Sequence, residues 1–552
     1  MANFPFKLSF PSFLSPSRSQ SKPSHHNPAP YSLLPKMQAQ EIQLQPSQVQ
    51  TAPQNDQKEP INQPTPSSLM DTSNLLPPSR QTCTVPKPIS TTKSSSNKLK
   101  LIPLIFLIYF EVAGGPYGAE ESIQAVGPLY AIIGFFIFPF LWGVPESLVT
   151  AELATALPGN GGFVVWADRA FGPFFGSLMG TWKYLSCVIN IGAYPPMCAD
   201  YISRAYPPAA AGPGRSVAIS ITVVLLCLLN YTGLSVVGWG AVVLAVVTLT
   251  PFFLITILAI RRIQPKRWLV QVETKDWRLF INTLFWNLNY WDSASTMAGE
   301  VEQPEKIFPK GLAIAVVICS VSYFLPLMAC TGAIGSPPEA WVNGYFADVA
   351  EMVGGDWLKY WIQAGAVLSS IGLYEAQLSS GAFQLLGMAD LGLLPSFFAV
   401  RAPKFDTPWV GILSSCIITL TISFLPFEDI VATANILYSL GMLLEFATFL
   451  WLRVKYSDLM RPYRVPMGIP GLIVMCLFPS VFLGYVIAVA HPRVFALSAV
   501  LTAAGITVHY LMRYCRSSGL LKFTDGGRVD QHQQLEQKSI IPGHEEEING
   551  VV

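Results

Sequence analysis

Acidic residues flank a glycine-rich run in an otherwise apolar part of the 552-residue sequence. Glu111 precedes the run, and Glu120 and Glu121 follow it. Ionisable side chains are costly in apolar surroundings unless they face a cavity or a partner. The run lowers helix propensity and removes one backbone donor, so we expect a helix to unwind at Gly114, Gly115, Pro116, Tyr117 and Gly118.

A second polar stretch interleaves amides, aromatic rings and a carboxylate. Its side chains compete with helical backbone bonding and cannot face lipid at low cost. They predict a second interrupted helix, and a polar stripe packed against neighbouring helices is the alternative interpretation. The candidate residues are Asn287, Asn289, Tyr290, Trp291 and Asp292.

Carboxylates that alternate with aromatic faces suit an apolar chain bearing several ammonium groups. An ammonium over Trp or Tyr gains about 0.5–2 kcal/mol, depending on desolvation. An unpaired buried carboxylate costs several kcal/mol, so such a ligand fits the two stretches better than a zwitterion does. Glu375 either lines the same cavity or packs between helices. No nucleophile elbow, phosphate loop or metal cluster is present, so we expect neither an enzyme nor a bound cofactor.

The composition places these stretches in a lipid bilayer. The chain is 51% hydrophobic and only 12% charged, with a mean hydropathy of +0.41. Its apolar blocks approach the roughly 20 residues that cross a membrane as a helix. We therefore predict an all-α polytopic membrane protein with twelve spans, near residues 101–125, 129–156, 174–203, 216–234, 238–260, 279–302, 309–333, 357–388, 408–426, 429–452, 469–490 and 494–513. A short helix at the membrane surface is expected between residues 158 and 173.

Both ends of the chain have a different composition. Residues 1–98 are rich in Pro, Ser and Gln, and residues 516–552 are polar, so we expect two disordered tails around a transporter domain at 99–515. Most basic residues near span ends fall on the side of the N-terminus, which predicts cytosolic termini. The loop with Arg261, Arg262, Lys266 and Arg267 is the exception. The plasma membrane is the expected location, and an endomembrane or plastid envelope is the alternative.

The two expected breaks lie in spans one and six, which open two successive groups of five spans. Interrupted helices at corresponding positions indicate an inverted-repeat transporter with its site between them. The repeats would cover residues 101–262 and 278–454, followed by extra helices at 469–513.

The sequence EVAGGPYGAEESIQAVGP at 111–128 and the sequence NYWDSASTMAGEVEQPEKIFPK at 289–310 resemble the amino acid–polyamine–organocation superfamily. Within it, the chain looks like the plant polyamine uptake transporters of the L-type amino acid transporter branch. The resemblance covers about residues 100–515 and implies a leucine-transporter-type fold that works by alternating access. Gly114, Gly115 and Gly118 match the unwound part of helix one, and Trp291 matches a position beside that of helix six.

The resemblance implies import of spermidine, spermine, putrescine or paraquat-like dications. Amino acid carriers of this branch hold the substrate carboxylate on bare amides of a Gly-Ser-Gly-like segment, whereas here Pro116 removes a donor. The fifth span also lacks the lysine that some members place at the coupling-ion position. An exchanger of cationic or neutral amino acids, and a sensor that binds without transport, are the alternatives.

Glu111 is the first candidate for a proton carrier, because no neighbouring cation in the sequence could hold it ionised. His491 and His509 fall in the last two spans, outside the ten-helix core, and sodium is the alternative coupling ion. The expected partners are the polyamine and the bilayer, with no nucleic acid. The loop Arg204–Arg215 has no cysteine, so no disulfide-linked heavy chain is expected.

Overall fold

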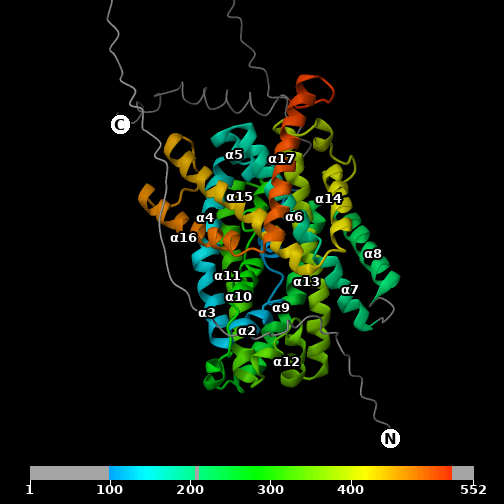
Figure 1. The fold of residues 1–552 in the computed structure, drawn as a ribbon, viewed down its shortest axis with the longest axis vertical. Coiled ribbons are helices and arrows are strands. Elements are labelled where there is room, and N and C mark those ends of the chain that lie inside the picture. The colour runs from blue at the N-terminus through cyan, green and yellow to red at the C-terminus, as the bar shows by residue number, and fades with distance from the viewer. Residues whose placement is uncertain (1–97, 206–210, 525–552) are drawn as a thin grey trace, which may run out of the picture. The chain divides into compact units, whose positions relative to one another are not determined.

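The computed structural model describes residues 98–205 and 211–524, which belong to one compact helical unit (Figure 1). The predicted N-terminal tail falls outside the described residues except for its last position. In the predicted C-terminal tail, helix α17 continues to Ser517, and the carbonyl of Lys522 accepts a 2.8 Å hydrogen bond from the amide of Ser396. Residues 525–552 lie outside the description.

The helices follow one another with short connections, and two isolated β-bridges are the only strand-like pairings in the described ranges. The bounds are α1 (Leu101–Val112), α2 (Glu120–Val126), α3 (Pro128–Phe138), η1 (Pro139–Gly143), α4 (Val144–Ala156), α5 (Phe163–Phe171), α6 (Pro173–Ile191), α7 (Tyr194–Ala205), α8 (Gly212–Tyr231), α9 (Leu234–Ile260), η3 (Pro265–Leu269), α10 (Trp277–Asn287), η4 (Ser293–Thr296), η5 (Ala298–Glu300), α11 (Pro304–Ala333), η6 (Pro338–Ala340), α12 (Tyr345–Gly354), α13 (Asp356–Asp390), η7 (Ser396–Ala399), α14 (Trp409–Ile422), α15 (Phe427–Lys455), α16 (Ile469–Ala488) and α17 (Pro492–Ser517).

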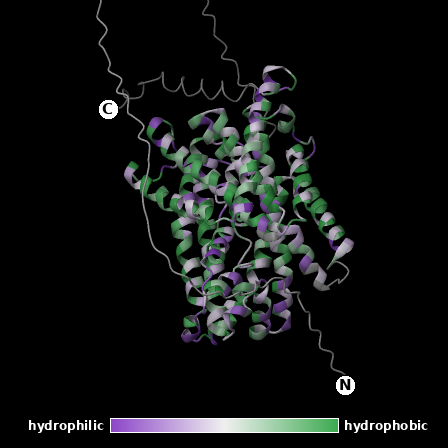
Figure 2. Cartoon of the chain, viewed as in Figure 1, coloured by the Kyte–Doolittle hydropathy of each residue, from purple (hydrophilic) through white to green (hydrophobic). Residues whose placement is uncertain are grey.

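The outward faces of several helices are apolar. Leu225 on α8, Val243 and Phe253 on α9 and Val481 on α16 are each more than half exposed, and hydrophobic residues cover these outer helices in Figure 2. Water would make this surface unfavourable, whereas lipid contacts it without cost. Seven helical stretches of the described chain are long and apolar enough to cross a membrane. The protein is therefore an integral, multi-pass α-helical membrane protein.

Both expected interruptions are present. Helix α1 ends at Val112 and α2 begins at Glu120, so the glycine-rich run is not helical. Helix α10 ends at Asn287 and is followed by the 3-10 turns η4 and η5 instead of a returning α-helix. The expected span 279–302 is thus helical only in its first half. Side chains explain this, because Thr296 Oγ1 donates to the carbonyls of Ser293 and Ser380, at 2.9 Å each.

Three further details differ from the expected spans. The third span is split at Gly192 into α6 and α7, and α7 opens with Pro195 and Pro196 in its first turn. The second span contains the π-helical segment η1. Helix α12 was not expected, whereas α5 is the short helix predicted between residues 158 and 173.

A buried ionic network ties α4 to the end of α15 and to the segment that follows it. Glu152 Oε1 lies 2.6 Å from Arg453 Nη1 and 2.9 Å from Arg461 Nε, and its Oε2 accepts from the amide of Val465 at 2.8 Å. Arg453 also donates to the carbonyl of Val465 at 2.8 Å. Because Glu152 contacts two guanidinium groups and a backbone amide, its carboxylate is not a bare buried ion, and the network fixes three segments against one another.

Replacing Arg453 tests this network. Arg453→Met keeps an unbranched side chain but leaves Glu152 short of a donor, so we expect a loss of about 3 kcal/mol of stability. Thermal unfolding in detergent should show a clear fall in melting temperature, whereas Lys455→Met, at an exposed position two residues along, should not. Equal melting temperatures for the two variants would contradict the assignment.

Candidate functional site

A small cavity lies where the two interruptions meet. It has about 20 Å³ of free space, enough for one or two water molecules but not for an organic ligand. Three of the expected residues line it, namely Gly114, Tyr117 and Asn287. The other lining residues are Val112, Ala113, Tyr194, Met197, Trp286, Tyr323, Ser369, Ser370, Leu373 and Gln377. In this conformation the cavity is too small for a larger ligand, whose binding requires the surrounding helices to move apart.

The first interruption is held by contacts that need glycine. The carbonyl of Gly114 accepts a 2.6 Å hydrogen bond from Ser369 Oγ on α13, and a Cβ at Gly114 would lie 2.0 Å from that oxygen. Gly118 has φ +85°, a conformation that L side chains rarely adopt. Its amide donates to Glu120 Oε2 at 2.8 Å. The unwound segment is therefore held at Gly114 by Ser369 of α13 and at Gly118 by Glu120 of α2.

Glu120 is buried and has several donors. Besides the amide of Gly118, its carboxylate accepts from the amides of Gly344 and Phe346, at 3.2 and 3.5 Å. Backbone N–H groups thus stabilise the Glu120 carboxylate in its position next to α12. Glu121, the next residue of α2, is half-buried. Neither side chain lines the cavity, although both lie on the helix that begins directly after the interruption.

The second interruption places Tyr290 in a strained conformation, with φ 68°. Its amide donates to Tyr438 Oη at 2.8 Å, and its hydroxyl lies 2.8 Å from Ser186 Oγ. The rings of Tyr290 and Tyr438 are 4.4 Å apart. Left-handed backbone at a non-glycine residue persists only where neighbours over-determine it, and such strain is concentrated at functional sites.

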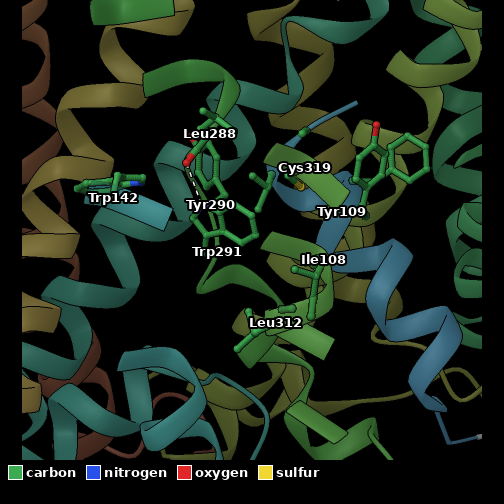
Figure 3. Packing of buried hydrophobic residues seen from close by; sticks show 14 of the residues in the cluster. Ile108, Tyr109, Trp142, Leu288, Tyr290, Trp291, Leu312 and Cys319 are labelled. Atoms are coloured by element: carbon green, nitrogen blue, oxygen red, sulfur yellow. Dashed lines mark hydrogen bonds between the residues drawn. The ribbon is translucent and has the colours of Figure 1, made fainter. Parts of the chain in front are cut away.

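Trp291 is fully buried and is not among the residues that line the cavity. Its indole N–H donates to the carbonyl of Leu288 at 2.9 Å, the contact dashed in Figure 3. A Cβ at Gly143 of η1 would lie 3.2 Å from the indole ring.

The two asparagines of the second stretch have polar partners. Asn287 accepts from Tyr323 Oη at 3.0 Å, and Asn289 donates to Asn435 Oδ1 at 3.4 Å. Of the expected polar residues here, Asn287 alone borders the cavity.

Glu111 is the last acidic residue of α1 before the interruption. Its side chain is fully buried, and neither carboxylate oxygen has a hydrogen-bond partner among the described residues. Its backbone carbonyl accepts from Gln377 Nε2 at 3.0 Å, and Gln377 lines the cavity. Glu111 is thus held next to the cavity through its backbone.

Asp292 is the centre of an ionic cluster that the sequence analysis did not predict. Its Oδ2 lies 2.6 Å from Lys183 Nζ on α6, and its Oδ1 accepts from Tyr438 Oη at 3.0 Å. Tyr438 also hydrogen-bonds to Glu146 of α4, and Glu445 Oε2 lies 3.7 Å from Lys183 Nζ. We call Lys183, Asp292, Glu146, Glu445 and Tyr438 the lysine cluster. Its ionisable side chains are all at most 3% exposed.

A sequence signal for part of this cluster exists. Lys183 and Glu445 lie in the interior of expected spans three and ten, whereas the other acidic residues of these spans, Asp200 and Asp429, lie near a span end. Charged residues at such depth mark functional sites by default. Tyr438 gives no such signal, since tyrosines are common in apolar helices. Glu375 lies elsewhere: its Oε2 accepts from Asn230 Nδ2 of α8 at 2.9 Å, and it does not line the cavity.

Metal chemistry finds no support in the described ranges, where no group of three His, Cys, Asp or Glu side chains could hold a metal ion. The lysine cluster already contains an ammonium in contact with Asp292. What the geometry around the two interruptions offers is therefore carboxylates, aromatic rings and amides. These groups bind organic cations and polar groups, and they hold them without covalent chemistry.

Comparison with known proteins gives consistent matches over most of the chain. The model of the amino acid permease family matches residues 99–508. A probable polyamine transporter of Arabidopsis thaliana is 48% identical over 437 residues, which are 79% of this chain and 91% of the relative. The polyamine transporter RMV1 of the same plant is 44% identical over 79% of this chain and 90% of its own length. The polyamine transporter PUT1 of Oryza sativa subsp. japonica is 46% identical over 78% and 81%.

Gly114→Ala should disturb the cavity. The added methyl group would overlap Ser369 Oγ and Leu373 Cδ1, so a loss of about 1–3 kcal/mol is expected from overpacking. The measurement is thermal unfolding in detergent. Gly240→Ala on α9 is the matched control, because a Cβ there meets nothing within 4 Å, and it should leave stability unchanged or raise it. Similar melting temperatures for both variants would show that the close approach at Gly114 is unimportant.

Proposed function

Since the chain belongs to the amino acid permease family, in the group that contains the plant polyamine transporters, we propose that it transports polyamines across a membrane. It is a transporter rather than an enzyme. The substrates in this proposal are spermidine, spermine, putrescine and paraquat-like dications. Import driven by a coupled ion is the proposed direction of transport.

The sign of the charge at the interruptions carries this proposal. Glu111, Glu120 and Asp292 are all buried there, and Lys183 is the buried ammonium that the described residues place among them. The amide of Gly118, which could hold a substrate carboxylate, is already bound by Glu120. A zwitterion would bring a carboxylate to a region where most of the buried charged side chains near the interruptions are already carboxylates. A polyamine brings ammonium groups alone, so its charge complements the site.

The transport cycle would use both interruptions. We infer twelve spans in two inverted repeats of five, plus two further helices, in the leucine-transporter-type arrangement. The two breaks at corresponding positions of the repeats support this inference. The cavity of about 20 Å³ is too small for a polyamine, so binding would require one side of the molecule to open. Alternating access would then expose the cavity to each side in turn.

Proton coupling through Glu111 is the proposed source of energy, with sodium as the alternative. The carboxylate of Glu111 is buried without a hydrogen-bond partner, and a proton would remove the cost of its charge. The remaining parts of the proposal are a plasma-membrane location, cytosolic termini and function without a disulfide-linked heavy chain. Non-reducing electrophoresis of protein purified from its native membrane tests the last of these.

Uptake into proteoliposomes tests the function directly. The purified protein should accumulate labelled spermidine, and unlabelled putrescine and spermine should compete. Arginine and leucine at the same concentrations should not. Accumulation should be larger when the external solution is more acidic than the lumen. Saturable uptake of leucine or arginine without uptake of spermidine would support the amino acid exchanger, and binding without any flux would support a sensor.

Asp292→Asn keeps the shape of the side chain and removes its charge. If Asp292 and the carboxylates beyond the first interruption hold separate ammonium groups, triamines and tetramines should lose more affinity than diamines. The expected loss is about 1.5–3 kcal/mol, the scale of a charged hydrogen bond. Binding of labelled spermidine and putrescine measures it, and the exposed Asp356→Asn is the control. An equal and small effect on all polyamines would remove Asp292 from the site.

Glu111→Gln separates coupling from substrate binding. If Glu111 carries the proton, the variant should lose pH-driven accumulation and retain exchange of spermidine that is already on both sides of the membrane. The physical reason is that glutamine mimics the protonated carboxyl that would move inward with the substrate, whereas the return of the empty carrier would require Glu111 to have released its proton. Both fluxes are measured in proteoliposomes, with Glu302→Gln at an exposed position as the control. Unchanged pH dependence in a folded variant would assign coupling to another group.

A further inference from the structure

The lysine cluster has an unusual excess of acidic groups. Asp292 and Glu445 form ion pairs with one ammonium, that of Lys183, and Glu146 joins them through the hydroxyl of Tyr438. The four ionisable side chains are almost completely buried. Glu146 Oε2 and Glu445 Oε1 have no hydrogen-bond partner among the described residues. In surroundings of low dielectric constant, three carboxylates and one ammonium leave two negative charges, which protons or other cations must offset. The cluster therefore has capacity for a further positive charge.

The ammonium of Lys183 is held as a bound ligand would be. Nζ lies 2.6 Å from Asp292 Oδ2, 3.9 Å from the centre of the Tyr438 ring and 5.2 Å from that of Phe163. Its aliphatic stem crosses Gly441 of α15, where a Cβ would lie 2.8 to 3.0 Å from the stem carbons. One carboxylate and two aromatic faces around an alkylammonium form a cation-binding site, and we call Asp292, Tyr438 and Phe163 the cation-binding box. The missing side chain at residue 441 leaves room for the stem.

The bound group is also chemically informative. A lysine side chain is a four-carbon chain that ends in a primary ammonium, which is the same chemical group as the aminobutyl end of putrescine and spermidine. The box thus shows which ligand it accepts. Lys183 lies about two helical turns along α6 from Asn190. Asn190 hydrogen-bonds to the cavity-lining residues Gln377 and Trp286, at 2.9 and 3.0 Å.

We propose that Lys183 is a tethered substitute for substrate, which occupies the ammonium site at Asp292 and Tyr438 until the aminoalkyl end of a polyamine replaces it. The proposal rests on the proposed function. Glu445 Oε2, 3.7 Å from Nζ, is the carboxylate to which the displaced Lys183 ammonium moves. The loaded cluster then has two ammonium groups for its three carboxylates. In the empty carrier, Lys183 alone keeps Asp292 paired, so the protein reorients without a bare charge at this position.

Lys183→Met tests this assignment, because it keeps an unbranched stem and removes the competing ammonium. Apparent affinity for spermidine and putrescine should rise about tenfold. In the wild-type protein the Lys183 ammonium occupies the site most of the time, so only a small fraction of molecules can bind the ligand, and the variant removes this competition. Net uptake by the variant should slow relative to exchange, because its empty carrier has Asp292 unpaired. Lys183→Arg keeps the charge and should show no gain in affinity. Arg453→Met, which breaks a buried ion pair away from the cavity, should show none either.

Binding is measured by equilibrium binding of labelled spermidine to purified protein in lipid nanodiscs, with folding checked by size-exclusion chromatography. If Lys183→Met alone does not fold, Lys183→Met combined with Glu445→Gln removes one charge of each sign and should show the same gain. Unchanged or weaker affinity in either folded variant would overturn the proposal and give Lys183 a structural role. A wild-type protein that binds no polyamine would overturn the proposed function and this inference together.

Discussion

Buried carboxylates in a membrane need a positive charge, and much of the centre of this molecule follows from that requirement. Charges removed from water cost several kcal/mol each unless partners and hydrogen bonds compensate for them. The structure answers the requirement differently at each position. Glu152 forms ion pairs with Arg453 and Arg461, Glu120 accepts hydrogen bonds from backbone amides, and Asp292 forms an ion pair with Lys183. Glu111 has no such partner among the described residues, which is why we assign it the exchangeable proton.

The same requirement for polar partners applies to the backbone of the two interrupted helices. Unwinding exposes amides and carbonyls that must find partners inside the protein, because lipid offers none. Ser369 supplies one at Gly114, Glu120 another at Gly118, and Tyr438 a third at Tyr290. Of these partners, Ser369 also lines the cavity. Widening the cavity would therefore rearrange a polar contact that holds the first break in place.

The sequence predicted the helical membrane class and the positions of both breaks, since glycine, proline and polar residues in apolar runs report directly on local backbone energetics. It did not predict that the second half of span six forms 3-10 turns, which depends on hydrogen bonds such as that of Thr296 to Ser380 in a distant helix. Nor did it pair Asp292 with Lys183, because the two are 109 residues apart and only tertiary packing brings them together. Trp291 was expected beside the substrate, yet the structure packs its ring against Gly143, a close approach that no local pattern reveals.

The central claim is that the site recognises ammonium groups at both ends of an aliphatic chain. Competition between two ligands of equal length tests it most directly: cadaverine has an ammonium at each end, and 6-aminohexanoate has a carboxylate in place of one of them. Both are titrated against labelled spermidine bound to the purified protein in nanodiscs. The account predicts that cadaverine displaces spermidine and that 6-aminohexanoate does not. Equal displacement by the two ligands, or preference for the zwitterion, would contradict it.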